Sequence, residues 1–140
     1  MKIALCHSFY SMEVVEKAIE VKDRLTKMGH TVFTAPYLEM SAVKLQELIS
    51  DRDYLDRTKP KLIKEHLDNI MESDAILVIN DKKDDIENYI GGSAFAEIMF
   101  AFYNNKKIFL FNPVPEIKIF NDELKAVKPI VINGNLNLIA

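Results

Sequence analysis

The segment Ala75–Ile79 constrains the fold more than any other part of this sequence. It is an unbroken apolar run, Ala-Ile-Leu-Val-Ile, between the polar pair Ser73-Asp74 and Asn80. A run this short, with two isoleucines and a valine, favours a strand over a helix. A strand that is apolar on both sides must be covered on both faces, as the strands of parallel sheets are. We therefore expect Ala75–Ile79 to be a central strand with helices on both sides.

The rest of the chain alternates short apolar runs with amphipathic segments. The other expected strands are Ile3–Cys6, Thr31–Ala35, Lys107–Phe111 and Ile130–Ile132. The expected helices are Met12–Leu25, Ala42–Ile49, Pro60–Glu72, Ala94–Tyr103 and Asp122–Val127. Strands separated by helices imply a parallel sheet with right-handed crossovers. This pattern predicts the α/β class, as a flavodoxin-like, doubly wound, five-stranded parallel sheet of order 2-1-3-4-5 with helices on both faces.

Several helix ends carry recognisable signals. Ser11 is a candidate N-cap for the first helix, and Gly29 stands where a terminating glycine is expected. Pro60 suits the first turn of the third helix, because proline lacks the N–H that a first turn leaves unpaired. The charged stretch 51–53 before it is compatible with either a loop or a frayed helix.

Composition narrows the class of protein. The 140 residues are 49% hydrophobic and 28% charged, which fits a single globular domain spanning residues 1–140. The 18 basic and 21 acidic residues give a net charge of −3, which argues against a nucleic acid polymer as partner. No apolar stretch approaches the roughly 18 residues that cross a bilayer, and the N-terminus does not resemble a signal peptide. We expect a cytoplasmic protein that does not associate with membranes.

The cysteine and histidine content gives no motif for metal binding. Cys6 is the single cysteine, so neither an internal disulfide nor a thiolate-rich site can form. His7, His30 and His66 lie in separate segments, and no pair has the spacing of ligands on one helix. We expect no metal site and no cofactor.

Ligands of open parallel sheets bind beyond the carboxyl ends of the strands, where the strand order reverses. Three polar segments, 7–11, 80–93 and 112–116, meet at this edge, and the first two open helices whose N–H groups favour an anion. The candidate substrate-binding residues are Ser8, Phe9, Tyr10, Asn80, Tyr89, Gly91, Gly92, Ser93 and Asn112. The alternative for Ser8 is loop hydrogen bonding, and for Gly91-Gly92 a turn before a helix.

Glu97 is the most informative single residue. It is the one acidic residue in an otherwise apolar helix, Ala94–Tyr103. Such a carboxylate either points to the mouth of the sheet or is buried at a substantial free-energy cost, and buried carboxylates are candidate functional groups. The alternative is a structural glutamate that hydrogen-bonds a backbone group or a neighbouring loop.

Three stretches in this order resemble the nucleoside 2-deoxyribosyltransferase superfamily, which includes the deoxynucleoside 5′-monophosphate N-glycosidases. They are Asp74–Asn80, Asn88–Glu97 and Asn105–Phe111. Glu97 stands where the family has its catalytic glutamate, and Ser8 matches a substrate-contacting serine of the glycosidase branch. Specific motif content covers about 40 residues around Glu97. The stretch Phe111–Glu116 further resembles uncharacterised, transferase-like prokaryotic proteins.

The resemblance implies a small-molecule nucleoside or nucleotide substrate. The Glu97 carboxylate would attack C1′ and expel the base, and water or a second base would resolve the glycosyl-enzyme ester. The family's acid, an aspartate, aligns with His66, two residues before Asp68, and a first-strand tyrosine aligns with Ala4. Tyr10 and Tyr89 are candidates to replace that tyrosine. Family members form dimers or larger homo-oligomers. The aromatic residues of segment 95–103 also favour a homo-oligomer, because they offer more apolar surface than one small sheet needs.

His66 can be interpreted in two ways. A histidine can act as general acid near neutral pH, which makes it a catalytic candidate beside Glu97. Its neighbours Lys64 and Glu65 favour instead the solvated face of a charged helix.

Two other functions stay open at this point. A nucleotide or sugar-nucleotide binding module without chemistry would explain the missing tyrosine and the histidine in place of the acid. A flavodoxin-like redox protein is weaker, because no loop has the phosphate-binding Ser/Thr-rich stretch of flavodoxins.

Overall fold

The five expected strands pair into one parallel sheet of order β2-β1-β3-β4-β5, as the sequence predicts. The computed structural model describes residues 1–8, 11–35, 38 and 40–140. The strands are β1 (Lys2–His7), β2 (Thr31–Phe33), β3 (Ala75–Ile79), β4 (Lys107–Leu110) and β5 (Ile130–Val131). All five residues of β3 are buried, so the apolar run is the central strand it was expected to be.

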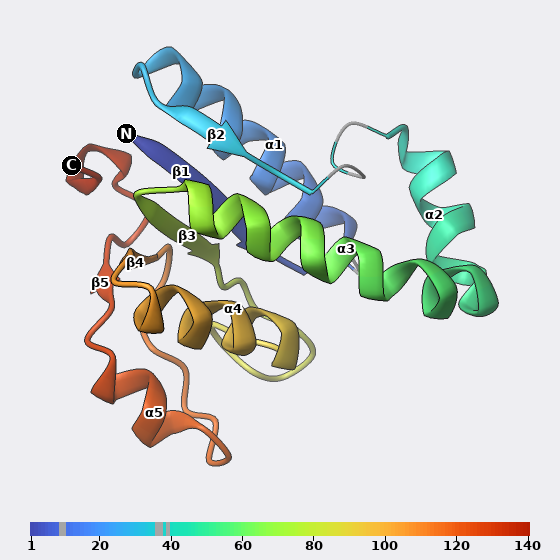
Figure 1. Ribbon diagram of the computed structural model, residues 1–140. Helices are drawn as coiled ribbons and strands as arrows, with labels where there is room; N and C mark the ends of the chain where they lie inside the picture. Colours follow the sequence, from blue (N-terminus) through green and yellow to red (C-terminus); the bar gives the residue numbers. More distant parts are fainter. Residues whose placement is uncertain (9–10, 36–37, 39) are drawn as a thin grey trace.

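Helices cover both faces of this sheet (Figure 1). They are α1 (Met12–Lys27), α2 (Ala42–Ser50), α3 (Arg52–Glu72), α4 (Gly92–Tyr103) and α5 (Asn121–Ala126), with the short 3-10 helix η2 (Leu136–Leu138) near the C-terminus. In Figure 1, α1 lies behind the sheet, whereas α3 and α4 lie in front of it. The N-terminal half of α3 extends past the carboxyl end of β1.

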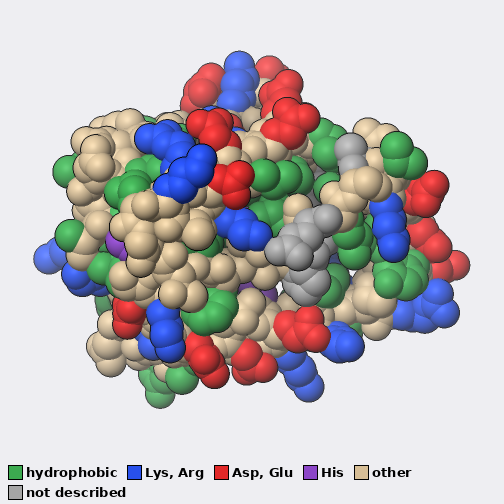
Figure 2. All heavy atoms as spheres, turned by 90° about the horizontal axis from the view of Figure 1, so that it is seen from above, with side chains coloured by type: hydrophobic (Ala, Val, Ile, Leu, Met, Phe, Trp, Pro, Cys, Tyr) green, Lys and Arg blue, Asp and Glu red, His purple; other side chains and the backbone are tan. Residues whose placement is uncertain are grey.

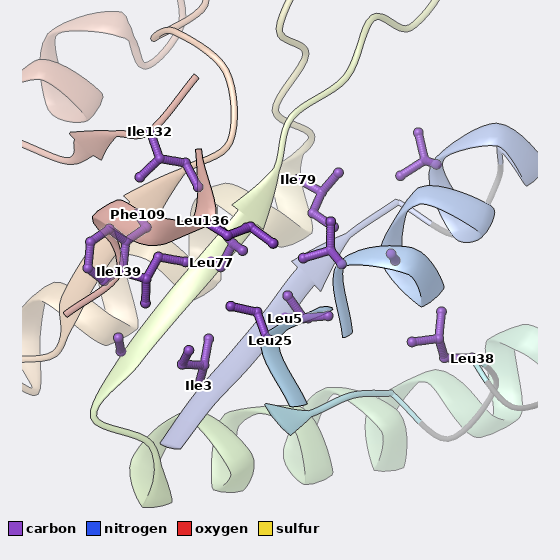
Figure 3. Packing of buried hydrophobic residues seen from close by; sticks show 14 of the residues in the cluster. Ile3, Leu5, Leu25, Leu38, Leu77, Ile79, Phe109, Ile132, Leu136 and Ile139 are labelled. Atoms are coloured by element: carbon purple, nitrogen blue, oxygen red, sulfur yellow. The ribbon is translucent and has the colours of Figure 1, made fainter. Parts of the chain in front are cut away.

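The alternating side chains of β1 and β3 divide the buried interior into two clusters. Ile3 and Leu5 pack with Leu77 and residues of α1 and η2 (Figure 3). Ala4 and Cys6 point to the opposite face, where they pack with buried residues of α3 and α4. This alternation aims the Cys6 side chain at the same layer as α4.

The helix signals are confirmed in part. Gly29 has a φ of +90°, and His30 N donates to Leu25 O at 3.0 Å, which is the left-handed glycine termination of a helix. Ser11 occupies the N-cap position of α1, but its side chain accepts no capping hydrogen bond from the described residues.

The expectation for Pro60 is wrong. Pro60 lies inside α3, which begins at Arg52 rather than at the proline. The cause is Asp51, whose side chain accepts a hydrogen bond from Tyr54 N at 3.0 Å and caps the helix eight residues earlier. The charged stretch 51–53 is thus the start of a helix. Elsewhere the strand and helix ends differ from expectation by at most two residues.

Among the described residues, no helix is both long and apolar enough to cross a membrane. On the face shown in Figure 2, acidic and basic side chains are interspersed, with apolar side chains between them. This mixed surface agrees with the small net charge.

We expect the end of α4 to lie in a contact between copies of this chain. Phe102 and Tyr103 are 51% and 83% exposed, which is unusual for large aromatic side chains. Light scattering should give at least twice the mass of one chain, and the double variant Phe102→Glu/Tyr103→Glu should give one chain mass because it places charge in the contact. Val43→Glu, which charges an exposed site on α2, is the matched control. A monomeric wild type would contradict this expectation.

Candidate functional site

A cavity of about 290 Å³ lies beyond the carboxyl ends of β1 and β3. These two strands are neighbours, and the chain continues from β1 to β2 on one side and from β3 to β4 on the other. The cavity therefore sits at the switch point of the sheet, where doubly wound folds bind ligands. Leu5, Val78 and Ile79 form its floor, and α3 and the start of α4 form its walls.

Most of the candidate residues from the sequence line this cavity. Glu97, His66, Ser8, Tyr89, Gly91, Gly92 and Ser93 all contribute to its wall. Gly91 leaves room for an aromatic ring, since a Cβ at this position would stand 3.3 Å from Cε1 of Tyr89. A Cβ at Gly92 would meet no atom within 4 Å, so the backbone there borders open space. Phe9 and Tyr10 lie outside the described residues.

Asn80 and Asn112 were also expected to bind substrate, but neither lines the cavity. Asn80 is fully buried, and its Nδ2 donates to Asn112 O and Pro113 O, each at 3.0 Å, while its Oδ1 accepts from Asn112 N at 2.8 Å. Asn112 Nδ2 donates to Asn80 O and to Asp81 Oδ1. These amides fasten the loops after β3 and β4 to each other instead of facing a ligand.

Glu97 lies in the second turn of α4, at the boundary between the cavity and the buried layer. Its side chain is 19% exposed, while the neighbouring Ile98 is fully buried against the sheet. Its Oε2 is 3.7 Å from Nε2 of His66. The sequence left open whether this carboxylate points to the mouth of the sheet or is buried. The structure shows both, because the carboxylate lines the cavity and is largely buried.

His66 does not lie on a solvated face, contrary to what its charged neighbours favour. Its side chain is 11% exposed and is turned inward from α3 toward Glu97. Its Nε2 also stands 3.5 Å from Sγ of Cys6 on β1. Asp68, the other candidate for the family's acid, is exposed and does not line the cavity. The helical periodicity of α3 turns position 66 inward and position 68 outward.

Burial is the largest cause of the pKa shifts of Glu97, His66 and Cys6. It raises the pKa of Glu97 from 4.5 to about 7, and a hydrogen bond from the Cys6 thiol partly offsets the rise. Burial, together with the nearby His7, lowers the pKa of His66 from 6.5 to about 4. Burial and then the Glu97 charge raise the pKa of the Cys6 thiol. At neutral pH the imidazole is thus neutral, and the contact between His66 and Glu97 is not an ion pair.

Cys6 is the functional candidate that sequence reasoning missed. Its Sγ, Nε2 of His66 and a carboxylate oxygen of Glu97 all lie within 4.8 Å of one another. The three residues come from β1, α3 and α4, so no spacing along the chain could reveal them. In the family that the sequence resembles, the tyrosine of the first strand aligns with Ala4. In this structure it is Cys6, two residues further along β1, that approaches Glu97.

Charged residues that were not expected also line the cavity. They are the basic residues Arg52, Lys59, Lys82 and Lys83 and the acidic residues Asp56 and Asp81. Asp81 forms an ion pair with Lys17 and accepts a hydrogen bond from Asn112. Its position two residues after the end of β3 was the signal in the sequence that could have identified it.

No protein-family model matches this sequence, and no curated protein matches it. Among solved structures, a 2-deoxyribosyltransferase from the psychrotolerant bacterium Bacillus psychrosaccharolyticus aligns with a TM-score of 0.55 at 22% identity, over 79% of this chain and 71% of that chain. The flavoenzyme FerB, an NAD(P)H:(acceptor) oxidoreductase from Paracoccus denitrificans, aligns at 16% identity with a TM-score of 0.49, over 93% of this chain and 74% of that one. The first similarity confirms, at the level of the fold, the resemblance drawn from the sequence; the second is too low to bear on function.

Replacing Asn80 tests its structural role. We expect Asn80→Ala to lower the free energy of unfolding by about 2–4 kcal/mol, because each buried polar group left unpaired costs about 1–3 kcal/mol. Urea denaturation measures this change, and the exposed Asn137→Ala is the control, with an expected effect within about 0.5 kcal/mol. An unchanged urea midpoint for Asn80→Ala would show that its amide does not hold the two loops together.

Proposed function

We propose that this protein cleaves or transfers the N-glycosidic bond of a nucleoside or nucleoside 5′-monophosphate, with Glu97 as nucleophile. The observation that supports this most directly is the position of Glu97. It is a largely buried carboxylate that lines the switch-point cavity of a fold shared with a 2-deoxyribosyltransferase. A buried carboxylate needs a reason to be retained, and covalent catalysis supplies one.

The proposed reaction has two displacement steps. In the first, a Glu97 carboxylate oxygen bonds to C1′ of the sugar, and the C1′–N bond breaks. The bonding electron pair leaves with the base, whose nitrogen takes up a proton. In the second, water or the nitrogen of another base attacks C1′ and releases the Glu97 carboxylate. Water as acceptor gives a hydrolase, whereas a second base gives a transferase.

His66 is suited to orient Glu97 rather than to protonate the base. The pKa of about 4 leaves the imidazole neutral at pH 7, so it carries no excess proton to deliver. A neutral ring can still hold the carboxylate through Nε2, which lies 3.7 Å away. We therefore assign His66 a positioning role and infer that water in the cavity supplies the proton to the leaving base. The general-acid role expected from the resemblance is not supported by this environment.

The charges around the cavity favour a substrate with a phosphate group. Four basic side chains line the cavity, compared with three acidic ones when Glu97 is counted with Asp56 and Asp81. The first turn of α4 also borders it. A helix N-terminus and nearby cations are the groups that bind phosphate in proteins. Nucleoside 5′-monophosphates are therefore the first substrates to test, ahead of the unphosphorylated nucleosides.

A second candidate is a nucleotide-binding module that performs no chemistry. The specific observation in its favour is the neutral His66, which leaves the departing base without a charged proton donor beside Glu97. The two candidates share the cavity and differ in whether base is released.

We expect Glu97→Gln to lower base release by about a thousandfold or more, because an amide oxygen cannot act as the nucleophile. The measurement is chromatographic detection of free base from a panel of deoxynucleosides and their 5′-monophosphates, each with and without an acceptor base. Glu123→Gln makes the same chemical change on the exposed surface of α5 and should leave the rate unchanged.

The same panel separates the two candidates. Turnover that survives Glu97→Gln would reject Glu97 as nucleophile. If wild type releases no base but binds a nucleotide in calorimetry, the binding module is the better description. Binding that persists in Glu97→Gln would strengthen that conclusion.

We further expect base release to rise as the pH increases through about 7. Below this pH Glu97 is protonated and cannot attack C1′, because burial holds its pKa at about 7. The rate should level off above it, and a carboxyl of ordinary pKa would instead give a flat profile between about pH 5.5 and 8.5. The profile is measured in buffers that contain a chelator, so that trace metal does not contribute.

Stability provides an independent check on the same titration. The folded-state pKa of Glu97 exceeds the unfolded value of 4.5, so its contribution is fully present below that value and is lost as the pH rises through about 7. Wild type should therefore lose free energy of unfolding relative to Glu97→Gln over this range. Parallel curves for the two proteins would contradict a raised pKa.

A further inference from the structure

We propose that Cys6, His66 and Glu97 form a binding site for a divalent metal of the zinc type, and that the bound metal coordinates the Glu97 carboxylate and so prevents its attack on a substrate. The three side chains bring one sulfur, one nitrogen and one oxygen ligand to a single point at the cavity wall. The effect on Glu97 rests on the proposed function, but the metal site itself does not.

Two of the three ligand-to-ligand distances are close to those around a tetrahedral zinc ion. Usual bond lengths of about 2.3 Å to sulfur and about 2.0–2.2 Å to nitrogen or oxygen place neighbouring ligand atoms about 3.3–3.6 Å apart. Sγ of Cys6 is 3.5 Å from Nε2 of His66, and Nε2 is 3.7 Å from Oε2 of Glu97. The Cys6 Sγ and the Glu97 carboxylate oxygen lie within 4.8 Å of each other, so a side-chain rotation that brings them to the tetrahedral separation completes the site.

The fold holds these ligands in place without a metal. Cys6 is paired in the sheet opposite Val78, His66 lies within α3, and Glu97 lies within α4. His66 and Glu97 border the cavity, so a metal there keeps one coordination position open to water or to a ligand. Three protein ligands with one open position is the arrangement of catalytic rather than structural zinc sites.

The chemistry of the ligands selects among metals. A thiolate and an imidazole favour zinc, cobalt or copper over magnesium and calcium, which prefer oxygen ligands. On coordination the Cys6 thiol releases its proton to solvent, so the thiolate and the carboxylate together carry two negative charges. A divalent cation neutralises both, which offsets the cost of burying charge at this place.

Metal binding and nucleophilic attack exclude each other. A Glu97 oxygen that shares its electron pair with a metal is not available to C1′, and the metal fills the space beside it. A metal-loaded chain is therefore inactive in the proposed reaction, and removal of the metal restores the carboxylate. The chemistry thus gives the site a way of being switched by zinc.

Cobalt(II) titration of the chelator-treated full chain tests the site without any substrate. We expect one cobalt per chain, intense visible bands of tetrahedral cobalt and a thiolate-to-cobalt charge-transfer band in the near ultraviolet, all abolished by added zinc. Cys6→Ser should remove the charge-transfer band, and His66→Gln or Glu97→Gln should weaken binding by about tenfold or more. Circular dichroism of each variant shows that the fold is retained.

His30→Gln is the matched control. His30 lies away from the cavity, where its Nδ1 is 3.1 Å from the amino terminus, a pair that could itself chelate a metal. Cobalt binding should be unchanged in this variant. No cobalt binding, binding without the charge-transfer band, or binding unaffected by Cys6→Ser would overturn the proposal.

Activity distinguishes this proposal from the proposed function. Where wild type releases base, zinc at one equivalent should stop the release and a chelator should restore it; release that persists in saturating zinc would overturn the blocking of Glu97. Where wild type releases no base, the proposed reaction fails, while the cobalt spectra still decide whether the metal site exists.

Discussion

The pairing of β1 with β3 is the constraint on which the rest of the structure depends. Five consecutive residue pairs, from Ile3 with Ala75 to His7 with Ile79, fix the two strands in parallel register. This register ends both strands at the same edge, so the segments that follow them meet around one cavity. The pleat then assigns alternate side chains to opposite faces, which sends Cys6 toward α3 and α4 and Leu5 toward α1. A slip of one residue would exchange these faces and remove the thiol from the site.

The burial of Glu97 is costly, and its surroundings reduce that cost only in part. The raised pKa expresses the remaining penalty on the charged form. Among the described residues, the basic side chain nearest to this carboxylate is that of His66, which is neutral at neutral pH, so the contact is not an ion pair. A glutamate that served only to stabilise the fold would be expected to have a cationic partner or several N–H donors. The fold thus keeps a buried carboxyl at the expense of stability, which is typical of functional sites.

The sequence was a good guide to what depends on local pattern and a poor one to what depends on distant contacts. The apolar run 75–79 and the helical periodicities suffice for the strand order, because burial on two faces leaves few alternatives. Glu97 was identifiable because one charge in an apolar helix conflicts with its neighbours. Pro60 misled, since the capping side chain of Asp51 starts the helix earlier than proline alone suggests. Asn80 was expected to bind substrate, but its amide hydrogen-bonds the loop after β4, a contact that the sequence does not reveal.

Cys6 illustrates the same limit and also unites the two proposals. Its neighbours approach it from 60 and 91 positions along the chain, counting from Cys6 to His66 and to Glu97, and only the sheet register brings them together. When Glu97 is ionised for attack, neither of its two neighbours is a good proton donor, because the pKa of the Cys6 thiol is raised and His66 is neutral at neutral pH. The same three groups are good ligands, since a metal replaces the protons and cancels the charges at once. The three groups thus leave an attacking Glu97 without a proton donor, yet they are the ligands of the proposed metal site, and the ionised, metal-free Glu97 is the form in which nucleophilic attack is possible.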